Sequence, residues 1–574
     1  MFTTLNVRVI LWATLAMALL VNYVTWLQDY PPAPAVAAAP APEASGGTRV
    51  GGVGLGSTVP SLSPPPAAGV AAPAPVVPAA LVAPAMPGAA VVPTAPTAPT
   101  VHVVTDVLDV QVALDGGELT RVDLPAYPQV KGEATPVRLL NRDSGASLFV
   151  LQSGLAGAAG SSMPTHLARF NATTGELRLG AGQNELQLPL TWTDGQGVTL
   201  TKTYTFRRGQ YQIGLDYRVQ NASAAPWQFA PYAQLLRNNE PVATSYFHPE
   251  SYAYKGPAYD DGQKYQKLKM GKEPPTLERQ IDGGWLAAMQ HHFVAAIVPP
   301  VGAAWHYVLT TQGNEYQLAA TGPSQQLAAG ASTTLHQTLY VGPKLQALLE
   351  QASPRLYLVT DYGKLSFLAR PLFWLLDQVH RIFGNWGWTI MIVTLLLKLL
   401  FYPLSEASMR SMARMKALQP RIKALQELYK DQRDKLGKAT MELYQKEKVN
   451  PVAGCLPMLI QFPVFIAFYW VLLESVEMRQ APFAGWIGDL SARDPLFILP
   501  VMMAGANYIN FKLNPQMGDP TQQKMFMIMQ IAMPVMFAFM PSGLVLYWTT
   551  NTVLSILQQW NINRRLAAQT KARN

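Results

Sequence analysis

A lysine inside an apolar segment is the residue of this chain best placed to do chemistry. Lys398 lies within Trp386–Leu404, which is predominantly apolar. At 1.5 Å per residue, a helix of this length just crosses the roughly 30 Å hydrocarbon core of a bilayer. An ammonium group at that depth costs about 2.5–3.5 kcal/mol, so the lysine is expected to face protein or water. Thr394 and Tyr402 fall on the same helical face. The pattern indicates either a lysine that snorkels to the near interface or a hydrated groove that needs a positive charge.

Other patterns that carry chemistry are missing from the sequence. There is no Gly-x-x-x-x-Gly-Lys-Ser/Thr phosphate-binding loop, and no paired carboxylates or Ser/His arrangement stands out. Cys455 is the single cysteine, which excludes an intramolecular disulfide and cysteine-based zinc sites. His291 and His292 are adjacent, but neighbours in a strand point to opposite faces, so they are not expected to share a metal ion. The sequence therefore predicts no metal, no cofactor and no enzymatic activity.

The composition favours a membrane protein of several domains. Of 574 residues, 49% are hydrophobic and only 14% are charged, with a mean hydropathy of +0.09. A soluble protein carries about 25% charged residues. The net charge of +9 could suit a nucleic-acid partner, but the basic residues lie mostly beside apolar segments. Membrane topology, in which lysine and arginine collect on the cytoplasmic side, explains them first.

The N-terminal hundred residues predict an anchor and a tether. Arg8 precedes an apolar run from Val9 to Trp26 that has no small-x-small cleavage site. Residues 1–28 are therefore predicted to be an uncleaved transmembrane anchor. Residues 29–100 are dominated by Pro, Ala, Val and Gly without a helical or strand period, and predict a semi-extended periplasmic linker.

Residues 101–345 predict a large antiparallel β-sandwich. Apolar and polar residues alternate on both sides of Arg207–Gln210, which is typical of a hairpin. Asp115-Gly-Gly117 predicts another turn. Residues 354–384 then change to a helical period with one apolar face. Such a helix before an apolar segment is expected to lie in the membrane interface; docking on the sandwich is the alternative.

Residues 385–562 predict a bundle of transmembrane helices. With the N-terminal anchor they make six spans, both termini inside; the five of this region are Trp386–Leu404, Val452–Leu473, Pro495–Leu513, Lys524–Phe539 and Leu544–Trp560. Between the first two, residues 405–450 form a basic helical hairpin, and residues 563–574 form a basic tail. Their cations either only mark the cytoplasmic side or contact anionic lipid headgroups or ribosomal RNA. The candidates for contact are Arg410, Arg414, Lys416, Arg564, Arg565, Lys571 and Arg573.

Several motifs after residue 449 resemble those of one known family. They are Asn450-Pro-Val-Ala-Gly-Cys-Leu-Pro-Met-Leu-Ile-Gln-Phe-Pro-Val-Phe, Arg479-Gln-Ala-Pro-Phe, Asp489-Leu-Ser-Ala-Arg-Asp-Pro and Pro541-Ser-Gly-Leu-Val-Leu-Tyr-Trp. Over about 363–560 the chain resembles the YidC/Oxa/Alb membrane insertases, and the anchor with its large sandwich is similar to the Gram-negative form. This resemblance implies a five-helix core with a hydrophilic groove, a β-supersandwich in the periplasm and a place in the bacterial inner membrane. Lys398 stands where the family commonly has arginine, and Trp548 where it has tyrosine. Both changes put in doubt roles that need a guanidinium fork or a phenol.

The resemblance also implies a mechanism and partners. Lys398, Thr394 and Gln461 would solvate the hydrophilic, often acidic, tail of an incoming protein, while Tyr547 and Trp548 line the exit to lipid. The expected partners are nascent membrane proteins, the Sec translocon, the ribosome and anionic lipids, with the chain acting as a monomer. Two other classes remain open: a secondary transporter, although no duplicated halves are visible, and an envelope protein that binds or processes glycans with its sandwich.

Overall fold

The computed structural model describes residues 55–60, 99–142, 147–158, 161–239, 245, 249–271, 275–429, 432–447, 451–513 and 520–573. Within these ranges the chain forms two compact units. A β-domain lies within Arg49–Glu240 and Lys255–Val359, and a helical unit lies within Thr360–Asn574. The predicted anchor, residues 1–28, lies outside the described residues, as does the predicted linker apart from residues 55–60 and 99–100.

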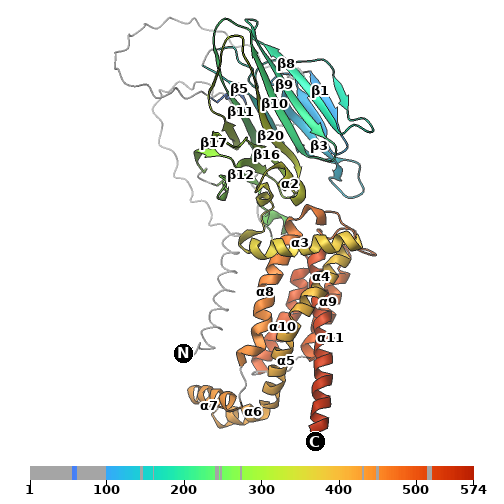
Figure 1. Ribbon diagram of the computed structural model, residues 1–574. Coiled ribbons are helices and arrows are strands. Elements are labelled where there is room, and N and C mark those ends of the chain that lie inside the picture. The colour runs from blue at the N-terminus through green and yellow to red at the C-terminus, as the bar shows by residue number, and fades with distance from the viewer. Residues whose placement is uncertain are drawn as a thin grey trace, which may run out of the picture. The chain divides into compact units, whose positions relative to one another are not determined.

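The β-domain is built from two large sheets, which confirms the predicted sandwich (Figure 1). The order of the first sheet is β14 (Leu277–Asp282), β17 (Ala304–Gln312), β18 (Glu315–Thr321), β11 (Trp227–Asn238), β5 (Phe149–Ala156), β3 (Glu118–Pro128), β2 (Asp109–Ala113), β1 (Thr100–Val104) and β7 (Glu176–Arg178). Two strands lie off this path, β19 (Gln325–Leu327) beside β11 and β4 (Pro136–Leu140) beside β3. The described strand pairs are antiparallel, except that β1 and β7 run parallel.

The second sheet holds the hairpin that the sequence predicts. Its order is β13 (Tyr265–Lys267), β12 (Gly256–Asp260), β15 (Trp285–Met289), β16 (Phe293–Val298), β20 (Ser332–Pro343), β10 (Gln212–Asn221), β9 (Val198–Arg207), β8 (Glu185–Thr193) and β6 (Asn171–Ala172). β9 and β10 pair antiparallel with Phe206 opposite Ile213, as the alternation predicts. The predicted turn between β2 and β3 is also confirmed, with Gly116 and Gly117 at φ of 83° and 54°. A short helix, α2 (Gln346–Ala352), follows β20.

The core of the sandwich contains a buried cation. Lys202 follows the apolar alternation of β9, so its side chain points inward. Its Nζ donates to the backbone oxygens of Gly117 at 2.7 Å and Ser153 at 2.9 Å. Burial lowers the pKa of Lys202 to about 7. These bonds join β9 of one sheet to β5 and the β2–β3 turn of the other.

A buried histidine makes the stability of the β-domain depend on pH. The backbone N–H of His166 donates to the Tyr232 hydroxyl oxygen, and this hydroxyl lies 2.6 Å from His166 Nδ1. Nε2 of the same ring lies 3.2 Å from the oxygen of Gly56. The neutral ring satisfies this arrangement by accepting from Tyr232 and donating to Gly56. Burial lowers the pKa of His166 to about 4.

We expect the β-domain to lose stability as the pH falls from about 6.5 towards 4. The unfolded chain binds the proton first, because its histidine pKa is near 6.5, and the loss reaches about 2.5 kcal/mol at about pH 4.5. Urea unfolding of the full-length protein, followed by tryptophan fluorescence, measures it. The His166→Gln variant serves as the control for carboxylates that titrate in the same range. Equal pH dependence in the two proteins would contradict the role of His166.

The second unit is a bundle of helices (Figure 1). They are α3 (Ser366–Phe383), α4 (Trp386–Leu400), α5 (Tyr402–Ala417), α6 (Gln419–Leu428), α7 (Arg433–Lys446), α8 (Pro451–Glu474), α9 (Ile498–Leu513), α10 (Pro520–Phe537) and α11 (Ser542–Arg573). α11 packs against α4 and α9, α8 packs against α3 and α5, and α9 packs against α10. Buried apolar side chains join them, including Leu376, Ile390, Phe468, Leu472, Met503 and Val545. The predicted helical C-terminal region is confirmed.

The lysine-bearing segment is not one continuous helix, and this part of the prediction is wrong. α4 ends at Leu400, and α5 starts at Tyr402 in a different direction. Pro403 explains the break, because its ring has no N–H and collides with the carbonyl one turn earlier. Judged by length and composition, no described helix could cross a bilayer alone. α4 and the start of α5, Tyr402–Ser411, meet that requirement together, with a bend of 61°.

Candidate functional site

Helix α4 is fixed at its first turn by a capping asparagine. The side-chain oxygen of Asn385 accepts from the N–H groups of Gly387 at 2.9 Å and Trp388 at 3.2 Å. Its side-chain nitrogen donates to the oxygen of Phe483 at 3.0 Å. Phe483 belongs to the loop between α8 and α9, so the cap ties α4 to that loop. This contact sets the position from which Lys398 extends.

Helix α11 is attached to the same loop. The N–H of Ser542 donates to the oxygen of Ala492 at 2.7 Å, and the Ser542 hydroxyl donates to the oxygen of Asp489 at 2.7 Å. The N–H of Gly543 donates to Leu490 at 2.9 Å. The free donors at the start of α11 are thus satisfied by loop carbonyls. One loop therefore holds both helices that face each other across the pocket.

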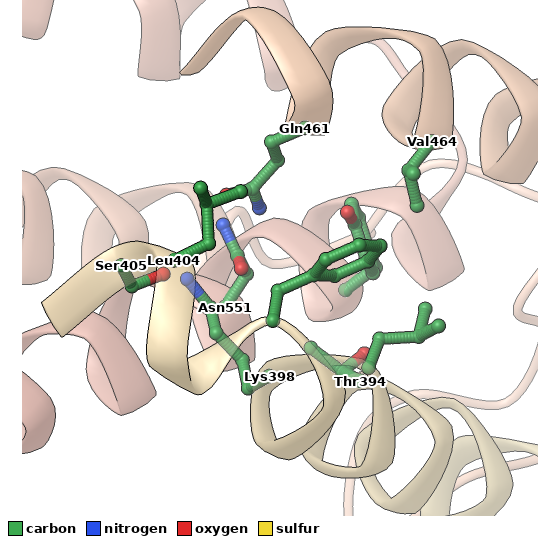
Figure 2. Close-up of a pocket in the computed structure, with 10 residues that line it drawn as sticks. Thr394, Lys398, Leu404, Ser405, Gln461, Val464 and Asn551 are labelled. Carbon is green, nitrogen blue, oxygen red and sulfur yellow. The ribbon is translucent and has the colours of Figure 1, made fainter. Parts of the chain in front are cut away.

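A small pocket lies between α4, α5, α8 and α11, with a volume of about 40 Å³. At roughly 10–15 Å³ per water centre, it has room for about three water molecules. Figure 2 shows the polar ends of Lys398, Gln461 and Asn551 directed towards one another across it. The lining residues are Thr394, Leu397, Lys398, Phe401, Leu404, Ser405, Gln461, Val464, Tyr547 and Asn551.

Lys398 supplies the charge of this pocket. Its Nζ donates to the hydroxyl of Ser555 at 2.8 Å, and that hydroxyl donates to the oxygen of Asn551 at 2.8 Å. In the part of the chain that the structure describes, no carboxylate pairs with Lys398. A half-buried cation without a counter-ion creates a positive potential that favours an incoming anion. Its hydrogen-bond partner among the described residues, Ser555, is neutral, so an acidic group would not have to displace a salt bridge there.

The structure brings together four of the six residues that the sequence predicts for the groove: Lys398, Thr394, Gln461 and Tyr547. The hydroxyl of Thr394 donates to the oxygen of Ile390 at 2.6 Å, so towards the pocket it can only accept. Tyr547 stacks on Phe468 at a centroid distance of 4.3 Å and lines the pocket together with Gln461. These contacts hold Tyr547 as a wall of the pocket.

The two other predicted groove residues lie elsewhere. Tyr402 lies beyond the break in the helix and does not line the pocket; Phe401, Leu404 and Ser405 take that place. Trp548 does not line the pocket and packs edge-on against Phe465 at a centroid distance of 5.0 Å. The prediction of a polar stripe through Tyr402 assumed a straight helix, and Pro403 removes that assumption.

Sequence reasoning missed Asn551 and Ser555, which face Lys398 from α11. With the predicted Tyr547 they are spaced four residues apart and therefore lie on one helical face. Ser555 is not singled out by the sequence because a serine in an apolar helix commonly bonds its own backbone. A search for polar residues at this spacing, matched to the spacing of Thr394 and Lys398, would have found the pair of stripes.

The predicted basic contact residues lie on α5 and α11. Arg410 and Arg414 are exposed on α5, and Arg410 pairs with Glu406 at 2.5 Å. Arg564 and Arg565 are exposed on α11, and the guanidinium of Arg564 lies 5.7 Å from the ring centre of Trp560. The side chains of Lys416, Lys571 and Arg573 lie outside the described residues. The cations that are described are thus accessible to a partner.

The adjacent histidines differ from the sequence prediction. His291 and His292 lie in the turn between β15 and β16, not in a strand, and their rings stack at 3.8 Å. The argument that they point to opposite faces is therefore wrong, because a turn does not impose the alternation of a strand. Within the described ranges, no group of three or more His, Cys, Asp or Glu residues is arranged to hold a metal ion.

Large apolar side chains cover much of the outside of the helical unit. α3 exposes Phe367 at 76% and Ile382 at 76%. The other helices expose Leu396, Leu399, Leu400, Val501, Met502, Ile509, Ile528, Val535 and Leu557. Soluble proteins rarely expose apolar surface on this scale. A helical unit that is apolar outside and holds a cationic, polar pocket, joined to a β-sandwich domain, defines a two-domain protein of the membrane.

Comparison with known proteins narrows this class to one family. The model of the YidC periplasmic domain matches residues 100–375, and that of the 60Kd inner membrane protein matches residues 378–570. The membrane protein insertase YidC of Thioalkalivibrio sulfidiphilus is 48% identical over 480 residues, which cover 81% of this chain and 85% of that protein. That of Nitrosococcus oceani is 41% identical over 565 residues, 98% of this chain and 99% of the relative. The chain belongs to the YidC family of inner membrane proteins, so the resemblance seen in its motifs is confirmed.

A solved structure of an active YidC insertase, with its first transmembrane domain resolved, also matches. It covers 80% of this chain and 92% of that chain, with 20% sequence identity and a TM-score of 0.36.

Proposed function

We propose that this chain is a membrane protein insertase, which places and helps to fold proteins in the bacterial inner membrane through its lysine pocket, alone or with the Sec translocon. The observation that carries the proposal is Lys398, which has no carboxylate partner among the described residues, in a polar pocket of an apolar helical unit. The relatives bear the name membrane protein insertase. The chain acts on nascent membrane proteins as a monomer and without enzymatic chemistry.

The pocket lowers the barrier that a hydrophilic tail meets in the membrane. Each polar group that enters hydrocarbon without a partner costs several kcal/mol. Lys398, Gln461 and Asn551 offer donors and acceptors that replace water for such a tail. At about 40 Å³ the pocket holds only a few waters, so α4 and α5 must separate from α8 to admit a polypeptide. The apolar segment of the substrate then leaves between the helices into lipid, at a gain of a few tenths of a kcal/mol per residue.

The helical unit supports a topology with cytoplasmic termini and a periplasmic β-domain. We place an anchor at residues 1–28, a linker at 29–100, the periplasmic supersandwich at 101–345, the interfacial helix at 354–384, five family-type spans within 385–562, the basic hairpin at 405–450 and the tail at 563–574. α3 fits the interface because Leu372 and Leu376 are buried while Phe367 and Trp374 are exposed. Such a helix lays its exposed apolar side on the lipid boundary.

The decisive experiment follows newly made membrane proteins after the chain is depleted from its cell. Radiolabelled substrates that fail to insert stay protected from protease added outside the inner membrane. We expect wild-type chain supplied in trans to restore cleavage of the translocated tails. Normal insertion in fully depleted membranes would contradict the insertase function.

The basic surface provides a second test of the proposal. We infer that Arg410, Arg414, Lys416, Arg564, Arg565, Lys571 and Arg573 contact ribosomal RNA and anionic headgroups. Phosphate contacts weaken steeply with salt, so co-sedimentation with ribosomes should fall at least about tenfold between roughly 50 and 200 mM salt. Replacing Arg564 and Arg565 by Gln should lower both the binding and its salt slope. Binding that does not change with salt would indicate apolar contact instead.

A further inference from the structure

A short piece of the predicted linker is bound to the β-domain. Leu55–Ser57 forms a single 3-10 turn, η1, closed by the N–H of Thr58 donating to the oxygen of Leu55 at 3.1 Å. Leu55 is only 3% exposed and packs on Val150 of β5 and Leu236 of β11. Forty-one residues, 59–99, lie between Thr58 and the start of β1. A connection of this length does not force the turn to lie against the β-domain.

The turn sits on three neighbouring strands whose side chains share one face. In the pairing of β11 with β5, Gln234 stands opposite Gln152, and Leu236 stands opposite Val150. In the pairing of β11 with β18, Leu236 stands opposite Gln317. Opposed residues, and residues two apart along a strand, lie on the same face of a sheet. The face therefore presents Val150, Leu236 and Gln317 side by side across the strands, and Gln152 and Gln234 side by side two residues away.

These amides bind the backbone of the turn. Gln317 Nε2 donates to the oxygen of Leu55 at 3.3 Å, Gln152 Nε2 to that of Gly56 at 3.4 Å and Gln234 Nε2 to that of Thr58 at 3.4 Å. The hydroxyl of Thr58 donates to Gln317 Oε1 at 2.9 Å. A ring nitrogen of His166 also reaches the oxygen of Gly56, at 3.2 Å. The main-chain oxygens of Leu55, Gly56 and Thr58 thus each accept from a side chain of the domain.

Two of the three amides are hydrogen-bonded to each other and fully buried, which suits a recognition site. Gln234 Nε2 donates to Gln152 Oε1 at 2.7 Å, and Gln152 Nε2 donates to Glu118 Oε2 at 2.9 Å. Gln152 and Gln234 have no exposed surface. Buried polar groups that lack partners destabilise a fold, so a face with three glutamines needs a ligand or water. Gln234 Oε1 remains without a partner among the described residues, so the site can still accept one hydrogen bond.

We propose that this face is a peptide-recognition site, and that its resident ligand is the chain's own segment Leu55-Gly-Ser-Thr58. The ligand is a turn with one buried leucine, a glycine and main-chain oxygens that accept hydrogen bonds from the domain. Gly56 fits closely, because a β-carbon there would already lie 3.3 Å from Leu236 Cδ2 and a larger side chain would collide with that leucine. When Leu55–Thr58 is bound to the β-domain, it divides the predicted linker into two shorter segments, one before and one after the bound turn. When it is released, the two become one longer segment. The bound state therefore limits how far the β-domain can move from the anchor, independently of the insertase function.

The test measures how well residue 55 is protected in the full-length protein. Because Cys455 is the single cysteine, the Cys455→Ala chain is a cysteine-free background. Leu55→Cys places a thiol at the buried position, and Ser57→Cys places one at an exposed position of the same turn. In detergent, we expect maleimide to label the first at least about tenfold more slowly than the second, as a site held closed most of the time requires. Equal rates would overturn the proposal.

Two variants separate specific recognition from general packing. Adding Gln152→Ala and Gln317→Ala should bring the two labelling rates within about twofold. Adding Gly56→Val should do the same while leaving the domain intact, because the change lies in the segment and not in a sheet. Protection that survives Gly56→Val would overturn the recognition of this turn.

Competition by a free peptide tests the site directly. A peptide with the sequence of residues 53–60 should speed labelling of the Leu55→Cys chain, and a scrambled peptide should not. The concentration needed is on the order of 1 mM, the effective concentration of a tethered segment. A native peptide that speeds labelling no more than the scrambled one would overturn the recognition site and leave the insertase function untouched.

Discussion

Replacing Lys398 by Ala is expected to slow insertion of substrates with acidic translocated tails about tenfold, and of substrates with neutral tails less than about twofold. A tenfold change corresponds to about 1.4 kcal/mol, a modest part of the attraction between two charges about 4 Å apart in a partly hydrated site. Lys398→Glu should be worse for the acidic class, because attraction becomes repulsion. Lys398→Arg should retain function, since charge and reach survive.

Ser555→Ala is the matched control for the charge. It removes the hydrogen bond to Lys398 Nζ but leaves the cation in the pocket, so it should affect acidic and neutral tails alike. The measurement inserts a pair of model substrates, identical except for the tail, into membranes that carry each variant at equal abundance. If Lys398→Ala slows both substrates equally, the electrostatic role of the lysine is wrong, while the insertase assignment stands.

Gly387→Ala is expected to destabilise the helical unit by about 1–3 kcal/mol, the usual effect of overpacking. A β-carbon at Gly387 would lie 2.0 Å from Cδ2 of Phe483 and 2.3 Å from its Cγ. Phe483 cannot easily move aside, because its ring meets Trp388 edge-on at 5.5 Å and its oxygen accepts from Asn385. The change therefore separates α4 from the loop that positions it.

Gly505→Ala provides the comparison for helix propensity. Gly505 lies within α9, and nothing comes within 4 Å of the β-carbon it would gain. This variant should be neutral or stabilising by up to about 1 kcal/mol. Thermal unfolding in detergent, followed by tryptophan fluorescence, should show a midpoint several degrees lower for Gly387→Ala alone. The same midpoint for both variants would show that the contact with Phe483 can relax.

Local patterns in the sequence were sufficient to predict individual helices and strands, but not the way in which they pair and pack. Alternation predicts β9 and β10, and apolar runs predict both ends of α8 and the start of α11 within two residues, while α11 continues to Arg573 beyond the predicted end at Trp560. The order of the two sheets could not be predicted, because β11 pairs with β5 and β18, and a period of two says nothing about distant partners.

The parts of the site that escaped prediction share a physical reason. Lys398 could be identified from the sequence because a charged residue in an apolar segment is rare. Ser555 and Asn551 belong to the site because their face of α11 packs against α4. Which faces of two helices meet is decided by packing and not by local sequence patterns. The docking of Leu55 could not be predicted, because the low complexity of residues 29–100 predicts a tether. A single turn that docks on a distant sheet is too short to produce a periodic pattern in the sequence.

The shortness of α4 has a consequence for the lipid around the proposed insertase. Its 15 residues rise about 22 Å at 1.5 Å per residue, less than the roughly 30 Å thickness of hydrocarbon. Leu396, Leu399 and Leu400 are exposed on it, so acyl chains must meet this helix directly. When a helix is shorter than the hydrocarbon layer around it, thinning of the bilayer reduces this hydrophobic mismatch. We therefore expect the bilayer to be thinner beside α4, where α5 turns away by 61°, and a tail that passes Lys398 to cross a thinner barrier there.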